Sequence, residues 1–198
     1  MAKIGLYFGS FNPIHIGHLA IAGYMVEFAG LDQVWFVVSP HNPLKKKETL
    51  LDNHQRLYMV QLAIGDNIRL KVSDIEFKLP VPSYTIDTLT YLQEKYPKNE
   101  ICLLMGEDNL NTLHKWKNAD ELTKRYPIYV YPRPNSIKPF SSPLEKILSG
   151  ANITHVNAPM MDISGTFIRE GIKNRKDMSY FLPAAVWKYI VEMHFYQK

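Results

Sequence analysis

The residues most able to do chemistry lie in residues 9–18, which read Gly-Ser-Phe-Asn-Pro-Ile-His-Ile-Gly-His. This segment places His15 and His18 three residues apart, and imidazole groups can donate hydrogen bonds to an anion. It follows an apolar run, Ile4–Phe8, that is typical of a strand, and it precedes an apolar-rich stretch, Leu19–Ala29, that predicts a helix. Because backbone N–H groups at a helix N-terminus favour an anion, this turn predicts a phosphate site.

Two glycines in the segment fit a binding role. Gly9 would let the backbone approach a ligand closely, and Gly17 would leave room between the two imidazoles. A lone His-x-x-His pair would instead favour a strand–turn–helix junction whose histidines are merely solvated. The whole ten-residue pattern, in its strand-to-helix context, favours the phosphate site.

The length and composition are those of a globular protein with one domain over residues 1–198. Hydrophobic residues make up 46% of the chain and charged residues 21%, which excludes an extensively disordered chain. The one cysteine, Cys102, lies in the apolar run Ile101–Met105 and reads as a buried strand residue. We therefore expect no disulfide and no cysteine nucleophile.

Charge and hydropathy indicate which partners to expect. The net charge of +4 is mild; it suits a phosphorylated substrate and does not demand nucleic acid. No apolar run approaches the ~18 residues of a membrane span, so no membrane partner is expected. The start of the chain, ending its first apolar run at Gly9, reads as too brief for a signal peptide, and we expect a cytoplasmic protein. The oligomeric state stays open.

Strand-like and helix-like segments alternate along the chain. The predicted strands are Lys3–Phe8, Gln33–Val38, Ile68–Val72, Ile101–Met105, Ile128–Tyr131 and Ile153–Val156. The predicted helices are Gly17–Ala29, Asn53–Ile64, Tyr84–Tyr96, Ala119–Arg125, Thr166–Asn174 and Ala184–Phe195. The Pro-rich stretch Pro132–Pro143 reads as a loop within the domain. The alternation predicts a Rossmann-like, doubly wound parallel sheet, whose ligands sit at the carboxyl ends of the strands.

The ten-residue segment resembles the H-x-G-H signature of the nucleotidyltransferase superfamily. Its longer form resembles the bacterial nicotinate-nucleotide adenylyltransferases, whose pattern is close to G-G-T-F-D-P-I-H-x-G-H. Three positions depart from that pattern: Phe8 replaces the first glycine, Ser10 the threonine and Asn12 the aspartate. Ser10 keeps the hydroxyl, whereas Asn12 lacks the charge.

Two further segments resemble elements of the same family. Ser39–Lys45 resembles its proline-rich loop, in which Lys45 would fold over a polyphosphate, while Lys46 and Lys47 read as solvated. Residues 83–89 read Ser-Tyr-Thr-Ile-Asp-Thr-Leu and match the family's S-Y-T-x-D-T-L. The resemblance implies that the Thr85 amide helps to hold the carboxylate of the nicotinate ring.

The same segment has a simpler interpretation that is compatible with binding. Ser83 or Thr85 could cap the helix that follows, since both lie at its predicted start. Asp87 and Thr88 are expected to fix the loop rather than to touch substrate.

A third region runs from Gly106 to Lys117. The turn Gly106-Glu107-Asp108 can present a carboxylate to ribose hydroxyls. Trp116 resembles the family residue that stacks on the pyridine ring, although an isolated tryptophan would more often be a core aromatic. Its polar neighbours favour the stacking role, and Lys117 stands where the family usually has an aromatic residue.

The fourth segment, Asp162–Arg169, resembles the superfamily's I-S-S-T-x-I-R signature, with Gly165 replacing one serine. A capping role is open for Ser164. The resemblance implies that this helix N-terminus and Arg169 hold ATP phosphates, and that Arg133 lies near the adenine.

Taken together, the resemblance implies transfer of AMP from ATP to nicotinate mononucleotide, giving deamido-NAD and pyrophosphate in NAD biosynthesis. The expected catalytic residues are His15, His18, Lys45 and Arg169. The expected ATP-binding residues are Gly9, Ser10, Phe11, His18, Gly106, Asp108, Arg133, Ser164, Thr166, Phe167 and Arg169. The expected nicotinate mononucleotide-binding residues are Ser10, His15, Lys45, Thr85, Asp108, Trp116 and Lys117.

Magnesium is expected to be carried by the ATP phosphates, so no protein metal ligands are assigned. Two alternatives stay open. One is another adenylyl- or cytidylyltransferase of the superfamily, for example one that acts on phosphopantetheine. The other is a non-catalytic nucleotide-binding regulator, because fold does not imply function.

Overall fold

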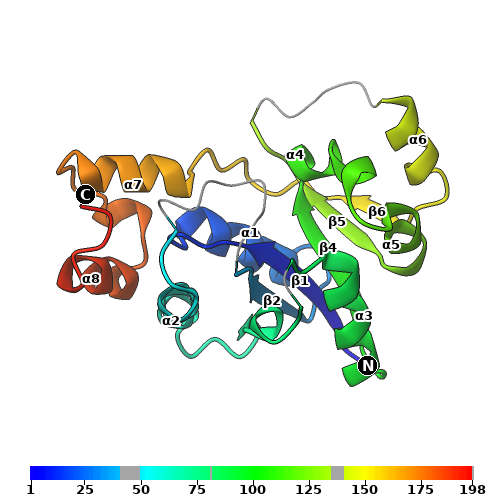
Figure 1. The fold of residues 1–198 in the computed structure, drawn as a ribbon, viewed down its shortest axis with the longest axis horizontal. Coiled ribbons are helices and arrows are strands. Elements are labelled where there is room, and N and C mark those ends of the chain that lie inside the picture. The colour runs from blue at the N-terminus through cyan, green and yellow to red at the C-terminus, as the bar shows by residue number, and fades with distance from the viewer. Residues whose placement is uncertain (41–49, 81, 135–140, 198) are drawn as a thin grey trace.

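The structure, a computed structural model, describes residues 1–40, 50–80, 82–134 and 141–197. These residues form a six-stranded sheet in the order β3-β2-β1-β4-β5-β6, in which every neighbouring pair of strands is parallel (Figure 1). The strands are β1 (Lys3–Gly9), β2 (Gln33–Val38), β3 (Leu70–Ser73), β4 (Glu100–Gly106), β5 (Ile128–Tyr131) and β6 (Ile153–His155). The α/β fold class predicted from the alternation is confirmed.

Helices cover both faces of the sheet. They are α1 (Ile16–Glu27), α2 (Asn53–Ile64), α3 (Thr85–Lys95), α4 (Glu107–Leu110), α5 (Ala119–Arg125), α6 (Ser142–Leu148), α7 (Gly165–Lys173) and α8 (Ala184–Glu192). Among the described residues, three short 3₁₀ helices join them, η2 (Ile75–Phe77), η3 (Leu113–Lys115) and η4 (Ser179–Phe181). In Figure 1, α7 and α8 lie at one end of the molecule near α2, and α5 and α6 lie at the other.

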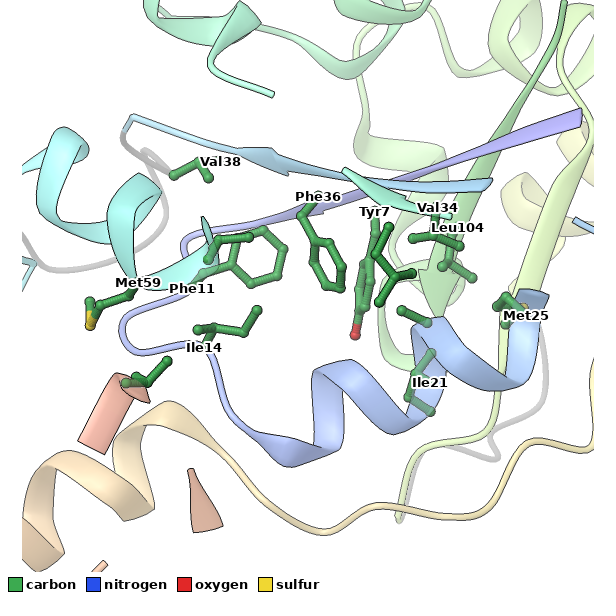
Figure 2. Close-up of a cluster of buried hydrophobic side chains, with 14 of the residues drawn as sticks. Tyr7, Phe11, Ile14, Ile21, Met25, Val34, Phe36, Val38, Met59 and Leu104 are labelled. Atoms are coloured by element: carbon green, nitrogen blue, oxygen red, sulfur yellow. The ribbon is translucent and has the colours of Figure 1, made fainter. Parts of the chain in front are cut away.

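Alternation along the central strands builds a core on each face. On β2, Phe36 points into the core that includes residues of α1, α2, α7 and α8, whereas Val37 points into the core that includes residues of α3, α5 and α6. Figure 2 shows Phe11, Phe36 and Tyr7 side by side between the strands and α1. Because β1, β2 and β4 are buried on both faces, they read as continuous apolar runs in the sequence.

Some predicted boundaries differ from those observed. β3 begins at Leu70 rather than at Ile68, which is exposed. The segment Pro132–Pro143 is not a loop throughout, because α6 begins at Ser142 with Pro143 in its first turn. Proline is tolerated there, where its missing N–H would have no partner in the helix. The prediction of one domain over residues 1–198 stays a prediction.

The sheet order defines where a ligand is expected. The chain runs from β1 outward to β2 and β3, and then returns to the other side of β1 to form β4. This reversal makes the carboxyl ends of β1 and β4 the topological switch point, where open α/β sheets bind their ligands. The histidine segment follows β1 directly, and Gly106 ends β4.

A buried arginine on α2 fixes the loops at this edge. The Arg56 side chain is fully buried, and burial lowers its pKa to about 10, so it stays charged at neutral pH. It donates to four backbone carbonyls and one side-chain amide, those of Ser10, Ser39, Pro40, Leu51 and Asn53. Sequence reasoning missed this residue, because nothing in α2 marks Arg56 as different from a solvated helix arginine.

We predict that Arg56→Lys destabilises the protein by about 3 kcal/mol, because three ammonium donors cannot replace five guanidinium donors and buried carbonyls lose their partners. Urea unfolding followed by circular dichroism measures the change. Arg125→Lys, an exposed change on α5, is the matched control and should be nearly neutral. Equal unfolding midpoints for the two variants would contradict the role of Arg56.

Candidate active site

The two histidines stack on each other at the start of α1. Their ring centroids are 3.7 Å apart, and His15 is the N-cap residue of the helix. The His15 backbone N–H donates to Nδ1 of His18 at 3.3 Å. Because Nδ1 accepts that hydrogen bond, a neutral His18 carries its proton on Nε2.

His15 is buried and neutral. It is 3% exposed, and burial, with a smaller contribution from Arg133, lowers its pKa to about 4. Gly17 creates the space for this ring, since a Cβ at that position would lie 3.1 Å from Nδ1 of His15. The predicted role of Gly17 was to leave room between the two imidazoles. The two rings instead stack on each other, and Gly17 makes room for the His15 ring.

A small pocket lies beside the histidine turn, between the ends of β1 and β5 and the segment before α7. Its lining residues are Tyr7, His15, Gly17, His18, Ile21, Tyr131, Pro132, Arg133, Met161 and Ile163. The buried hydroxyls of Tyr7 and Tyr131 are hydrogen-bonded at 3.1 Å, and the Arg133 guanidinium lies 5.5 Å from the centre of the Tyr131 ring. The pocket therefore joins the switch point to a cationic side chain.

The β4–α4 turn meets Arg133 in space. A Cβ at Gly106 would lie 2.5 Å from Oδ1 of Asp108 and 3.1 Å from Cγ of Arg133, so a larger residue would force these side chains to shift. Nε of Arg133 lies 3.9 Å from Asp108, whose side chain is 56% exposed. Three predicted ATP-binding residues are thus brought together at the ends of β4 and β5.

The N-terminus of α7 docks on the histidine segment. Ser164 caps α7 by accepting a hydrogen bond from the Phe167 N–H at 3.1 Å, as its capping interpretation predicts. Arg169 donates to the Asn12 carbonyl at 2.7 Å and to the Thr166 hydroxyl at 3.2 Å. The histidine segment and the Asp162–Arg169 segment are therefore in direct contact, through Asn12 and Arg169, which are 157 residues apart in sequence.

Gly165 explains one departure from the family pattern. A Cβ there would lie 2.8 Å from the Asn12 carbonyl oxygen, too close for a side chain. Glycine therefore lets α7 approach the histidine segment closely.

Asn12 is a structural centre of the histidine segment. It is 6% exposed, and its side-chain oxygen accepts hydrogen bonds from the Leu51 N–H at 3.3 Å and the Tyr196 hydroxyl at 2.8 Å. The neutral amide oxygen of Asn12 accepts from both donors, so these hydrogen bonds do not require the carboxylate of the family's aspartate. Sequence reasoning missed Tyr196, because a contact across 184 residues leaves no local pattern.

Gly9 and Phe11 have packing roles. The Phe11 ring is 2% exposed, and a Cβ at Gly9 would lie 2.9 Å from it. Gly9 thus makes room for the Phe11 ring, which lies in the core shown in Figure 2. Phe11 can therefore offer a ligand only its backbone. The backbone carbonyl of Ser10, between them, accepts from Arg56.

The predicted acceptor-binding residues come from α3 and the chain after η3. Thr85 is the first residue of α3, and the N-cap residue is Tyr84, which makes no side-chain capping bond. The capping interpretation of Ser83 or Thr85 stays a prediction. Lys117 pairs with Asp87 at 2.9 Å and lies 4.5 Å from the centre of the Tyr84 ring. Lys117 thus joins the two predicted acceptor-binding segments.

Trp116 occupies an intermediate position. It is half-buried and packs against the α3-side core, which supports part of its core interpretation. It also lines a separate polar groove formed by His114, Trp116, Asn118, Ala119, Asp120, Glu121, Lys124 and Ile147. Both the packing and the stacking interpretations fit this position.

Four other predictions concern the loop, metals, membranes and the cysteine. Lys45 lies outside the described residues. Within the part of the chain that the structure describes, no three His, Cys, Asp or Glu side chains gather as metal ligands. None of the described helices is long and apolar enough to cross a bilayer. Cys102 is buried in β4, as predicted, and burial raises its thiol pKa to about 12.

Comparison with known proteins defines the class to which this site belongs. The cytidylyltransferase-like family model matches residues 6–171, which include the histidine segment and the N-terminus of α7. The chain belongs to this family of nucleotidyltransferases.

Relatives narrow the class further. The chain is 57% identical over 196 residues to a probable nicotinate-nucleotide adenylyltransferase of Flavobacterium psychrophilum, covering 99% of this chain and 100% of that protein. It is 47% identical over 190 residues to a protein of the same description from Bacteroides fragilis, covering 96% and 92%. Within the superfamily, the chain belongs to the nicotinate-nucleotide adenylyltransferases.

A solved structure confirms the fold independently. The nicotinic acid mononucleotide adenylyltransferase of Plasmodium falciparum, complexed with NaAD, superposes with a TM-score of 0.79. The match covers 99% of this chain and 98% of that one at 18% sequence identity. At that identity the likeness concerns the arrangement of the sheet and helices.

We predict that His15 makes stability depend on pH. Its pKa of about 4 in the folded protein lies below the unfolded value of 6.5. The unfolded chain therefore binds more protons between these values, and stability is fully present above pH 6.5 and falls as the pH drops toward 4. The difference amounts to about 3 kcal/mol.

Urea unfolding of the ligand-free protein at pH 7 and pH 4 measures this effect, and His15→Gln removes the titrating group. The wild type should lose more stability than His15→Gln over this range, by that amount. Parallel losses in the two proteins would show that His15 does not titrate as described.

Proposed function

We propose that this chain transfers AMP from ATP to nicotinate mononucleotide, giving deamido-NAD and pyrophosphate. The observation that carries this proposal is the contact between the histidine turn and the N-terminus of α7, through Arg169 and the Asn12 carbonyl. It sets two anion-binding elements side by side at the switch point, as joining two phosphorylated substrates requires. The family relatives support the choice of substrates.

The reaction is an in-line displacement at phosphorus. An oxygen of the acceptor's 5′-phosphate attacks the α-phosphorus of ATP, and the bond from that phosphorus to the pyrophosphate oxygen breaks. The attacking group is already an anion, so no general base is required. The protein's task is to position two polyanions and to stabilise charge on the transferring and leaving groups.

Each of the proposed catalytic residues stabilises part of the negative charge on the phosphates. His15 and His18 donate hydrogen bonds to phosphate oxygens, and His15 does so as a neutral ring. Arg169 and Lys45 neutralise the leaving pyrophosphate. Arg169 suits this role because its partners in the free protein, a carbonyl and a hydroxyl, are neutral.

The remaining assigned residues are proposed to hold the two substrates. Gly106, Asp108 and Arg133 meet at the ends of β4 and β5 and would hold the nucleoside part of ATP. The cap of α7, with Ser164, Thr166 and the backbone of Phe167, would bind its phosphates. The backbone of Gly9, Ser10 and Phe11 would line the path between the substrates.

Nicotinate mononucleotide would lie toward α3. Its ring would stack on Trp116, and its carboxylate would meet the backbone N–H groups at Thr85, at the positive end of the helix dipole. Lys117 would act mainly by holding Tyr84 and Asp87, its observed partners. Ser10 and Asp108 would face both substrates, and His15 would face the acceptor.

Magnesium would reach the site on the ATP phosphates. The donors gathered here are imidazole, guanidinium and hydroxyl groups, a set that suits phosphate oxygens, whereas the exposed carboxylate of Asp108 suits ribose hydroxyls. The ion would neutralise phosphate charge, as it does in other phosphoryl transfers. We also propose a cytoplasmic location.

We predict that the enzyme prefers the acid nucleotide to the amide. A carboxamide removes a charge and brings an NH₂ group against N–H donors, leaving polar groups unpaired at ~1–3 kcal/mol. This corresponds to roughly tenfold to a hundredfold discrimination. Pyrophosphate release should be compared for nicotinate mononucleotide, nicotinamide mononucleotide and phosphopantetheine at fixed ATP. Equal use of the amide would refute the carboxylate site, and use of phosphopantetheine alone would refute the proposed function.

We predict that His18→Ala lowers kcat by ~10²–10³, because it removes a donor that stabilises the transition state. Steady-state kinetics with both substrates varied measures the effect, and the KM for the acceptor should change much less. His155→Ala, an exposed histidine on β6, is the matched control and should keep wild-type kinetics. Near-normal turnover of His18→Ala would exclude this role.

A further inference from the structure

A buried carboxylate that the proposed mechanism does not use lies beneath the acceptor-binding segment. Glu76, in η2, is 3% exposed. The Thr88 hydroxyl donates to its Oε1 at 3.0 Å. Burial raises the pKa of Glu76, because removal from water disfavours the charged form.

Hydroxyl groups from three parts of the chain converge on this carboxylate. Ser39, Ser83 and Thr88 each hydrogen-bond to Glu76, and each bond favours the ionised form and opposes the effect of burial. An ionised carboxylate accepts at two oxygens, so it can serve three donors at once. The carboxylate therefore joins the end of β2, the chain before α3 and the first turn of α3.

These donors bracket the proposed carboxylate site. Ser83 precedes Thr85 by two residues and Thr88 follows it by three, so the backbone N–H groups around Thr85 are held from both sides. Ser39 is in turn tied to the phosphate turn, since its N–H donates to the Gly9 carbonyl at 2.9 Å. Its own carbonyl accepts from Arg56 at 2.8 Å.

We propose that Glu76 is a positioning residue, which sets the N-terminus of α3 relative to the phosphate turn and thereby the affinity for the acceptor nucleotide. This inference rests on the proposed function and deepens it. Glu76 acts through Ser83 and Thr88 and does not itself contact the substrate.

The chemistry of the group explains why a carboxylate is needed. Glu76→Gln keeps the shape but replaces one acceptor oxygen with an NH₂ group, which presents donors to hydroxyl donors. A hydroxyl that faces this NH₂ group can only accept from it, so its own proton loses the carboxylate, and the start of α3 loses one charge-assisted hydrogen bond. Thr88→Val tests the same hydrogen bond by removing its donor, because valine keeps the shape of threonine but lacks the hydroxyl. Thr88→Ser keeps the hydroxyl and is the control.

The experiment measures kcat and both KM values for the wild type, Glu76→Gln, Thr88→Val, Thr88→Ser and Glu94→Gln. Glu94→Gln makes the same chemical change at an exposed position of α3 and should match the wild type. Glu76→Gln should raise the KM for nicotinate mononucleotide roughly tenfold, the equivalent of one charge-assisted hydrogen bond, with the KM for ATP within about twofold. Thr88→Val should raise the acceptor KM several-fold, and Thr88→Ser should restore it.

A merely structural role gives a different result. It would lower the melting temperature and the amount of active enzyme, and thus kcat, while leaving both KM values unchanged; that result would overturn the inference. A fall in the acceptor KM of Glu76→Gln would also overturn it. If Glu76→Gln does not fold, the comparison of Thr88→Val with Thr88→Ser decides in the same way.

Failure of this inference is distinguishable from failure of the proposed function. The wild type alone tests the function, through pyrophosphate release that depends on nicotinate mononucleotide. If the wild type shows that activity and the acceptor KM is the same in all variants, only the role of Glu76 falls. A wild type that does not use this acceptor overturns both.

Discussion

The position of the active-site turn depends on one buried cation, the guanidinium of Arg56. A charge removed from water is costly, and here it is compensated by carbonyl dipoles from the loops after β1 and β2 rather than by a carboxylate. Without the guanidinium, each carbonyl would lose this hydrogen bond. Without the carbonyls, the buried guanidinium would lose its acceptors. The two loops therefore hold their relative positions as a pair, and Ser39 extends this support to Glu76. A single carboxylate could accept from only part of the guanidinium, whose N–H groups point in several directions.

A second constraint joins the C-terminal part of the chain to the same turn. The Asn12 carbonyl accepts from Arg169, and the Asn12 amide oxygen accepts from Tyr196, so α7 and the chain after α8 both close on the segment after β1. Gly165 permits the approach because a side chain there would collide with Asn12. Two departures from the family pattern, Asn12 and Gly165, are therefore neighbours in space. Gly165 meets the backbone carbonyl of Asn12, which an aspartate would also present, whereas the Asn12 side chain serves Leu51 and Tyr196.

The parts of the fold that could be predicted from the sequence are those set by local patterns. β2, β5, α2 and α5 have the predicted bounds, because apolar runs and helical periodicity mark them. The short helices α4 and α6 were not predicted, since a single turn or two carries too little periodicity. In the candidate site, contiguous motifs predicted His15, His18 and Arg169, whose catalytic roles stay proposals. Arg56, Glu76 and Tyr196 were not, because their partners are distant in sequence and their own surroundings carry no signal.

The charges at the site are arranged so that a polyanion can recruit them at little cost. His15 is kept neutral by burial, and a neutral imidazole can donate a hydrogen bond at any pH near 7. Arg169 rests on a carbonyl and a hydroxyl, so a phosphate can take its guanidinium without breaking an ion pair. Lys117 differs, because its ammonium is held by Asp87 and would have to leave that carboxylate to reach a ligand. Both cations hold protein segments together, but the partners of Arg169 are neutral and the partner of Lys117 is a carboxylate. This difference favours Arg169 over Lys117 as the residue proposed to neutralise charge on the substrates.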